Sequence, residues 1–182
     1  MSSLNETASL NILSYLNEGR LVQRSWSREQ DGKHLGCLLH AAGGYNDVSE
    51  CPAQLMPRWV AECTITMFDK LQAGDVPAIA RRYASAIGKW DTVTPEAWDN
   101  ILRRWLVRLI DQAVDAVPTS AKSENYWPAI DQACTDVKGA LTSGDKDAAR
   151  AAAVAAYAAT DAAANNSLFN ALLDEIEKEI AA

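Results

Sequence analysis

Three residues that could bind a metal ion or activate a nucleophile lie close together in the sequence: His34, Cys37 and His40. Zinc accepts imidazole and thiolate ligands in tetrahedral sites. Each step of three residues turns a helix by about 300°, however, so on one helix the two histidines would point about 120° apart. A fourth ligand would have to come from Cys51 or Cys63. We therefore expect no metal site and no cofactor, and interpret Cys37 as a small buried thiol.

The same residues could form a thiol–imidazole pair for nucleophilic catalysis. Such a pair needs surroundings that stabilise a thiolate, and it needs an oxyanion hole, but no pattern in the sequence indicates either. Gly43-Gly44 lacks a following Gly-Lys-Ser pattern, so it indicates a loop and not a phosphate cradle. We expect that the protein is not an enzyme. A metal or thiol enzyme around His34, Cys37 and His40 is kept as an alternative.

Acidic side chains crowd the last two turns of a helix expected at the end of the chain: Asp174, Glu175, Glu177 and Glu179, with Lys178 among them. The helix dipole is negative at this end, so each carboxylate is disfavoured there by roughly a few tenths of a kcal/mol. A solvated face would account for the cluster. The sharper hypothesis is that this acidic face docks on a basic surface, either of the same chain or of a partner.

The basic residues that could receive such a face are concentrated in the middle of the chain, and the candidate binding residues among them are Arg81, Arg82, Arg104 and Arg108. Aromatic residues are interleaved with them and could stack nucleic-acid bases: Tyr83, Trp90, Trp98 and Trp105. These aromatic residues fall on the apolar faces of the expected helices. We therefore expect them in the core, and nucleic acid is not an expected partner.

The charge distribution separates the chain into unlike parts. The 182 residues carry a formal net charge of −7, to which residues 1–50, 51–110 and 111–182 contribute −2, +2 and −7. A nucleic-acid binder needs a basic surface that displaces phosphate counterions, so this balance argues against that class. With 48% hydrophobic and 23% charged residues, the composition is typical of a globular protein with one filled core.

The spacing of apolar residues predicts a mainly α-helical single domain of six to eight helices. We expect a tryptophan-rich helical body at residues 1–116, a connector at 117–123, and acidic, alanine-rich helices at 124–182 that pack on the body. The helices expected at 57–71 and 95–116 should form the core, because the first is apolar nearly all round and the second has a long apolar stripe.

Local signals define several element ends. Ser3 and Glu6 have the spacing of a capping box that starts a helix at residues 4–17, whose apolar stripe is expected to include Leu10. Asp31-Gly32 predicts a tight turn in one small β-hairpin within residues 24–36. A further helix is expected at 126–141, and Asp145 should cap a helix containing the twelve alanines between residues 148 and 164.

The ends of the chain and its cysteines indicate a compartment. The first residues contain no basic segment followed by a long apolar run, so neither a signal peptide nor a membrane span is expected. The four cysteines form no Cys-x-x-Cys pair. We expect a cytoplasmic protein with reduced thiols and no membrane partner.

One segment carries a resemblance to known proteins. The run Cys-Pro-Ala-Gln-Leu-Met-Pro-Arg-Trp-Val-Ala at 51–61, preceded by Glu-Gly-Arg-Leu-Val at 18–22 and Cys-Leu-Leu at 37–39, resembles small phage and prophage proteins that carry no assigned function. The resemblance covers about residues 18–110. It implies an accessory protein that acts inside a bacterial host, and no catalytic residues carry over from it.

These observations favour a non-enzymatic accessory protein that binds a host protein or protein complex. An inhibitor of a host defence complex, similar to an anti-CRISPR protein, is the specific form of this hypothesis, and the acidic helical face is its expected contact. The alternative from a different class is a self-associating structural module. In that module the alanine-rich and C-terminal helices would form the seam of a homodimer.

Overall fold

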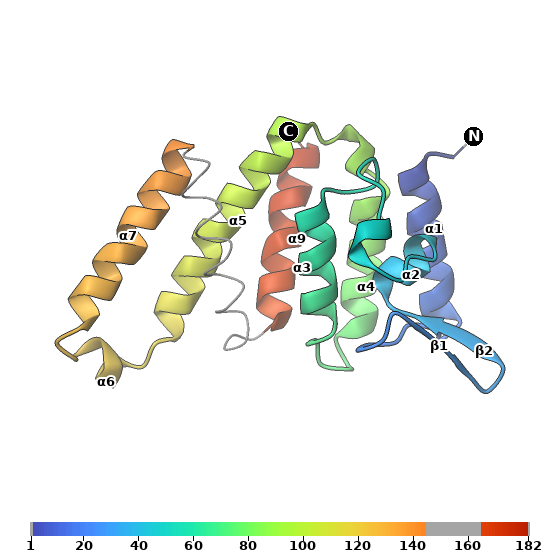
Figure 1. Ribbon diagram of the computed structural model, residues 1–182, viewed down its shortest axis with the longest axis horizontal. Coiled ribbons are helices and arrows are strands. Elements are labelled where there is room, and N and C mark those ends of the chain that lie inside the picture. The colour runs from blue at the N-terminus through green and yellow to red at the C-terminus, as the bar shows by residue number, and fades with distance from the viewer. Residues whose placement is uncertain (1, 145–164, 182) are drawn as a thin grey trace. The chain divides into compact units, whose positions relative to one another are not determined.

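The computed structural model describes residues 2–144 and 165–181 (Figure 1). Over these residues the chain forms eight α-helices, two short 3-10 helices and one two-stranded antiparallel hairpin. The predicted mainly α-helical fold with one small hairpin is confirmed for this part of the chain. The alanine-rich helix expected between residues 145 and 164 lies outside the described residues.

The element bounds follow the local signals closely. In chain order the elements are α1 Leu4–Asn17, β1 Ser27–Gln30, β2 Lys33–Gly36, α2 Leu38–Gly43, η1 Val48–Glu50, α3 Arg58–Phe68, α4 Val76–Ile87, η2 Trp90–Thr92, α5 Pro95–Ala116, α6 Thr119–Lys122, α7 Trp127–Ser143 and α9 Asn165–Ala181. The predicted helices at 4–17 and 95–116 match α1 and α5 at both ends. Helix α3 is shorter at both ends than the predicted helix at 57–71.

The described residues group into two compact units. Unit 1 comprises residues 2–94 and 165–181, and unit 2 comprises residues 95–144. This division differs from the expected boundary at the 117–123 connector, because α5 groups with α6 and α7, whereas α9 groups with the first four helices. The apolar side chains of α9 meet α3 and α4, and this long-range packing leaves no local signal in the sequence.

Tyr83 of α4 lies at the centre of the packing in unit 1, fully buried. Its ring meets Phe169 of α9 and Trp90 edge-on, with ring centroids 5.8 Å and 5.2 Å away. Its hydroxyl accepts a hydrogen bond from Thr64 of α3 at 3.2 Å and donates to Met56 Sδ at 3.8 Å. Burial raises the pKa of Tyr83, so the phenol stays neutral in the folded chain.

Helix α1 begins with the predicted capping box, in which Ser3 Oγ accepts from the Glu6 amide and the Glu6 carboxylate accepts from the Ser3 amide. The expectation that Leu10 lies in the buried stripe is wrong, because this side chain is 62% exposed. The buried face of α1 instead carries Asn5, Ala8 and Ile12.

The hairpin forms at the predicted turn. Asp31 and Gly32 both have positive φ, 52° and 70°, as a two-residue turn between twisted antiparallel strands requires. The register pairs Glu29 of β1 with His34 of β2. Cys37 then caps the amino end of α2, so β2 runs almost directly into a helix.

Unit 2 is built on the packing of α5 against α7. The apolar stripe of α5 is buried as predicted at Trp98, Ile101 and Trp105. Helix α7 ends where Gly144 adopts a left-handed conformation, with φ of 86°. Among the described helices, none combines the length and the apolar character needed to cross a membrane.

Asn5 joins three segments of unit 1 through one buried amide. Its side chain is 2% exposed, and its Nδ2 donates to the carbonyl oxygens of Leu55 at 3.1 Å and Ile87 at 3.0 Å. These carbonyls lie in the segment before α3 and at the end of α4. A buried carbonyl that loses its donor costs free energy, so this amide stabilises the position of α1 against both segments.

Replacing Asn5 with alanine should lower the free energy of unfolding by about 2–4 kcal/mol, because two buried carbonyls lose their donor together. Asn11→Ala is the matched control: Asn11 is exposed and donates one bond to the Ala42 carbonyl at 3.2 Å, so a loss of about 1 kcal/mol or less is expected. Urea unfolding followed by tryptophan fluorescence measures both. Equal losses in the two variants would contradict this role for Asn5.

Candidate functional site

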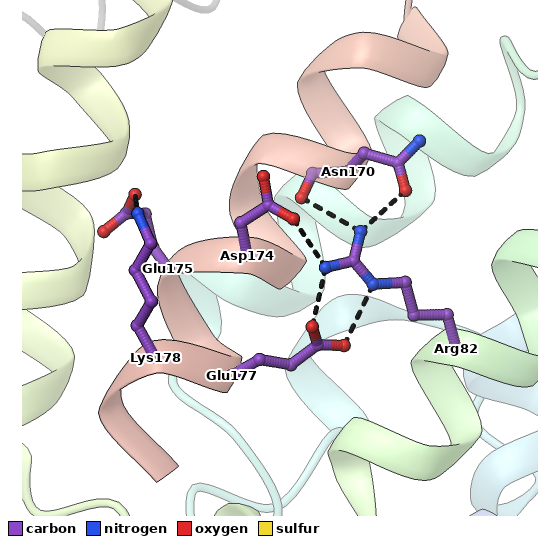
Figure 2. A network of polar contacts seen from close by, with 6 residues as sticks. All are labelled: Arg82, Asn170, Asp174, Glu175, Glu177 and Lys178. Carbon is purple, nitrogen blue, oxygen red and sulfur yellow. Dashed lines mark hydrogen bonds and ion pairs between the residues drawn. The ribbon is translucent and has the colours of Figure 1, made fainter. Parts of the chain in front are cut away.

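Arg82 of α4 and one face of α9 form the densest polar network described in unit 1 (Figure 2). The guanidinium donates from Nε and Nη2 to the two oxygens of Glu177 at 2.9 and 2.7 Å. Nη2 also donates to Asp174 at 2.6 Å, and Nη1 donates to the side-chain and main-chain oxygens of Asn170 at 2.8 and 3.4 Å. Arg82 therefore forms hydrogen bonds with three residues of α9 that are spaced about one helical turn apart.

This network uses the full hydrogen-bonding capacity of the guanidinium. Arginine has five N–H donors, and five bonds leave Arg82 towards α9. The bidentate contact with Glu177, joined by Asp174, raises the pKa of Arg82. Because no donor remains for a ligand, the network acts as a clamp that fixes α9 on α4, and Arg82 is a structural residue in this arrangement.

The other acidic candidates on α9 have different surroundings. Glu175 is 3% exposed and accepts from Lys178 Nζ at 2.8 Å, one turn along the same helix. Glu179 is half-buried. Of the acidic face predicted from the sequence, Asp174 and Glu177 are thus committed to Arg82, and Glu175 is paired with Lys178 (Figure 2).

The other basic candidates lie elsewhere in the sequence of helices. Arg81 is the neighbour of Arg82 on α4 but is exposed. Arg104 and Arg108 lie on α5 and belong to unit 2, where Arg104 is exposed and Arg108 is half-buried. Within unit 1, the structure therefore brings Arg82 to the predicted carboxylates Asp174 and Glu177.

His34 and His40 come together, although the sequence argument placed them apart. The expected separation of about 120° on one helix is wrong, because His34 lies on strand β2 while His40 lies in α2. Their Nε2 atoms are 2.7 Å apart. Among the described residues, no group of three or more His, Cys, Asp or Glu side chains is placed to hold a metal ion. The alternative set that adds Cys37 and a further thiol is therefore not assembled among these residues.

The four cysteines are free. Cys37 is buried at the start of α2, where its Sγ accepts from the His40 amide at 3.5 Å, and burial raises the pKa of this thiol. Burial also raises the pKa of Cys51 and of Cys63 to about 12. These three thiols are therefore protonated near neutral pH, which is the opposite of what a thiolate nucleophile requires.

Sequence reasoning missed two exposed apolar residues. Tyr126 immediately precedes α7, and Ile130 follows one turn later; they are 53% and 43% exposed. Their spacing of four residues places them on the same side of the helix. This i, i+4 spacing could have been found in the sequence, but without a structure it cannot be distinguished from a buried stripe.

Comparison with protein-family models, with curated proteins and with solved structures finds no match to this chain.

Arg82→Met should lower the free energy of unfolding by about 1–3 kcal/mol, because Asp174 and Glu177 lose a bidentate, charge-assisted partner. Arg81→Met is the matched control, since it removes an exposed arginine at the adjacent position and should change stability by less than about 0.5 kcal/mol. Thermal and urea unfolding of both variants measure the difference. A similar effect of the two substitutions would show that the clamp does not hold α9.

The half-buried thiols of Cys51 and Cys63 should make the fold sensitive to alkaline pH. The folded chain keeps protons on Cys51 and Cys63 up to about pH 12, whereas an unfolded thiol loses its proton near its usual pKa of 9.0. Their stabilising contribution is thus complete below pH 9 and is lost as pH rises towards 12. Urea unfolding between about pH 7 and 10.5 should show a steeper loss for the wild type than for Cys51→Ala/Cys63→Ala. Parallel pH profiles would contradict this.

Proposed function

We propose that the chain is a non-enzymatic accessory protein of the phage type, which acts in the bacterial cytoplasm by binding a protein or protein complex of the host. A defence complex, as for an anti-CRISPR inhibitor, is the partner class that we favour from the uneven charge of the chain, the lack of catalytic motifs in its sequence and the phage-type resemblance of residues 18–110. Protonated thiols and a saturated guanidinium support binding over catalysis, because neither offers a group ready for chemistry.

The observation that carries this proposal is the exposed pair Tyr126 and Ile130 on unit 2. Tyrosine is enriched among the residues that dominate protein–protein binding energy, since its ring buries a large area at low entropic cost. The acidic residues Glu124 and Asp131 flank the pair and are also exposed. An apolar centre with an acidic rim fits a partner pocket that is lined by apolar groups and bordered by basic ones.

The proposed contact therefore moves from α9 to α7. Asp174 and Glu177 cannot serve a partner without leaving Arg82, which would break charge-assisted bonds at 2.6 to 2.9 Å. The carboxylates of Glu124 and Asp131 carry the same charge without that cost. The proposed binding surface is thus still acidic, but it lies on unit 2 and not on α9.

The double variant Tyr126→Ala/Ile130→Ser should bind the host partner at least tenfold more weakly than the wild type, because it removes the apolar centre of the surface. Immobilised wild-type protein first captures the partner from a bacterial lysate, and titration of the purified partner then measures the affinity of each variant. Leu10→Ser is the matched control, since Leu10 is 62% exposed but lies on α1 of unit 1.

Three outcomes would count against the proposal. Equal weakening by Leu10→Ser would show a nonspecific effect of apolar exposure. Unchanged affinity in the double variant would show that α7 is not the contact. Light scattering that shows a dimer of the wild type and a monomer of the double variant would favour the self-associating module instead, with α7 as its seam.

A further inference from the structure

The contact between His34 and His40 has a second layer of partners that determines its chemistry. On the outer side of each ring, Nδ1 is hydrogen-bonded: His34 Nδ1 to the Glu29 carboxylate at 2.8 Å, and His40 Nδ1 to the Tyr45 carbonyl at 3.3 Å. On the inner side, the two Nε2 atoms face each other at 2.7 Å. Strand β2, which carries His34, lies beside α2, which carries His40, and β1 with Glu29 pairs with β2 (Figure 1).

These partners fix the tautomer of both rings. An ionised carboxylate and a main-chain carbonyl only accept hydrogen bonds, so each Nδ1 must carry the hydrogen. A neutral imidazole has one N–H, and its other nitrogen then presents a lone pair. Both Nε2 lone pairs therefore point into the same 2.7 Å gap, which is repulsive unless a positive species occupies it. That species is either a shared proton or a metal ion.

We propose that His34 and His40 form a binding site for a divalent transition metal ion that prefers imidazole ligands, such as Zn²⁺ or Cu²⁺, with water completing the coordination. Neutral imidazole nitrogens are common ligands for these ions. Ligating histidines in proteins generally donate their other ring N–H to a carboxylate or a carbonyl, and Glu29 and Tyr45 provide one of each. The site is independent of the surface proposed on α7.

The distances fit this ion after a small movement. With metal–nitrogen bonds of about 2.0 Å and tetrahedral angles, two ligand nitrogens lie roughly 3.3 Å apart, so the rings need to separate by about half an ångström. The His34 side chain is 45% exposed, which leaves room for this shift and for water ligands. His40 is 8% exposed and anchored in α2, so it is the fixed ligand and His34 the adjustable one.

Neighbouring residues support the position and the charge of the site. A Cβ at Gly36 would lie 2.5 Å from Cδ2 of His40, so the imidazole occupies space that only a glycine leaves open. The carboxylate of Glu29 supplies negative charge behind His34. Arg20 lies over the ring of Tyr15, which itself contacts His40, and its positive charge is paired with Glu18 at 2.8 Å.

Isothermal titration of the full chain, prepared without a polyhistidine tag, with Zn²⁺ tests the proposal. The wild type should bind one equivalent, and His34→Gln and His40→Gln should each bind at least tenfold more weakly. Glu29→Gln keeps an acceptor but removes its charge, and should weaken binding about tenfold. Cys51→Ser is the matched control and should bind like the wild type. Electron paramagnetic resonance of bound Cu²⁺ should show coupling to two imidazole nitrogens.

His34→Gln decides the result if the buried His40 variant does not fold, because His34 is partly exposed and its replacement should leave the circular dichroism spectrum unchanged. Retained Zn²⁺ affinity in His34→Gln, or a loss in Cys51→Ser, would overturn the proposal by placing the ion elsewhere. Absence of Zn²⁺ binding up to about 1 mM would also overturn it.

Discussion

The packing of α9 against α3 and α4 is the constraint on which unit 1 depends. Closing the 70 residues of 95–164 into a loop costs about 4 kcal/mol or more in chain entropy. The contacts of Arg82 are expected to contribute about 1–3 kcal/mol, so they cannot offset this cost alone. The apolar residues of α9, among them Phe169, Leu172 and Ile176, must provide most of it, because each contributes about 1.5–3 kcal/mol when buried.

Arg82 and Tyr83, at adjacent positions of α4, contact α9 in two different ways. Tyr83 is buried in the core and contacts Phe169 of α9. Arg82 is partly exposed and binds the carboxylates of Asp174 and Glu177 on the same helix, α9. Apolar contacts allow one helix to shift slightly along another. The bidentate contact between Arg82 and Glu177 forms only when α9 and α4 are aligned in one position. Carboxylates near the C-terminal end of a helix interact unfavourably with the helix dipole. For Asp174 and Glu177, the alignment of α9 on α4 that their bonds to Arg82 provide explains why they are there.

Local chemistry made much of the fold predictable. The capping box at Ser3 and the positive-φ turn at Asp31-Gly32 each act within a few residues, so the elements they define were found at the right places. Leu10 and Asn5 show the limit of such reasoning. Leu10 is exposed although it is apolar, whereas the polar Asn5 is buried because its side chain donates to two carbonyls from distant segments.

The candidate sites were less predictable than the helices, for a related reason. Arg82 and Asp174 were both identified by charge, but only the fold pairs them and leaves Arg81 exposed. His34 and His40 were judged as if they shared one helix. A strand that ends next to the start of a helix changes the direction of the chain, and this brought together two rings that helical geometry would separate.

Unit 1 is formed by two separate stretches of the chain, residues 2–94 and 165–181, so its folding depends on the order in which the chain is synthesised. A ribosome must complete the whole of unit 2 before it makes α9. Until then, Tyr83 lacks Phe169 and Arg82 lacks its carboxylates, so the apolar side chains of α3 and α4 that α9 contacts stay uncovered. Unit 2 can fold during this interval, and unit 1 closes only after translation has passed it.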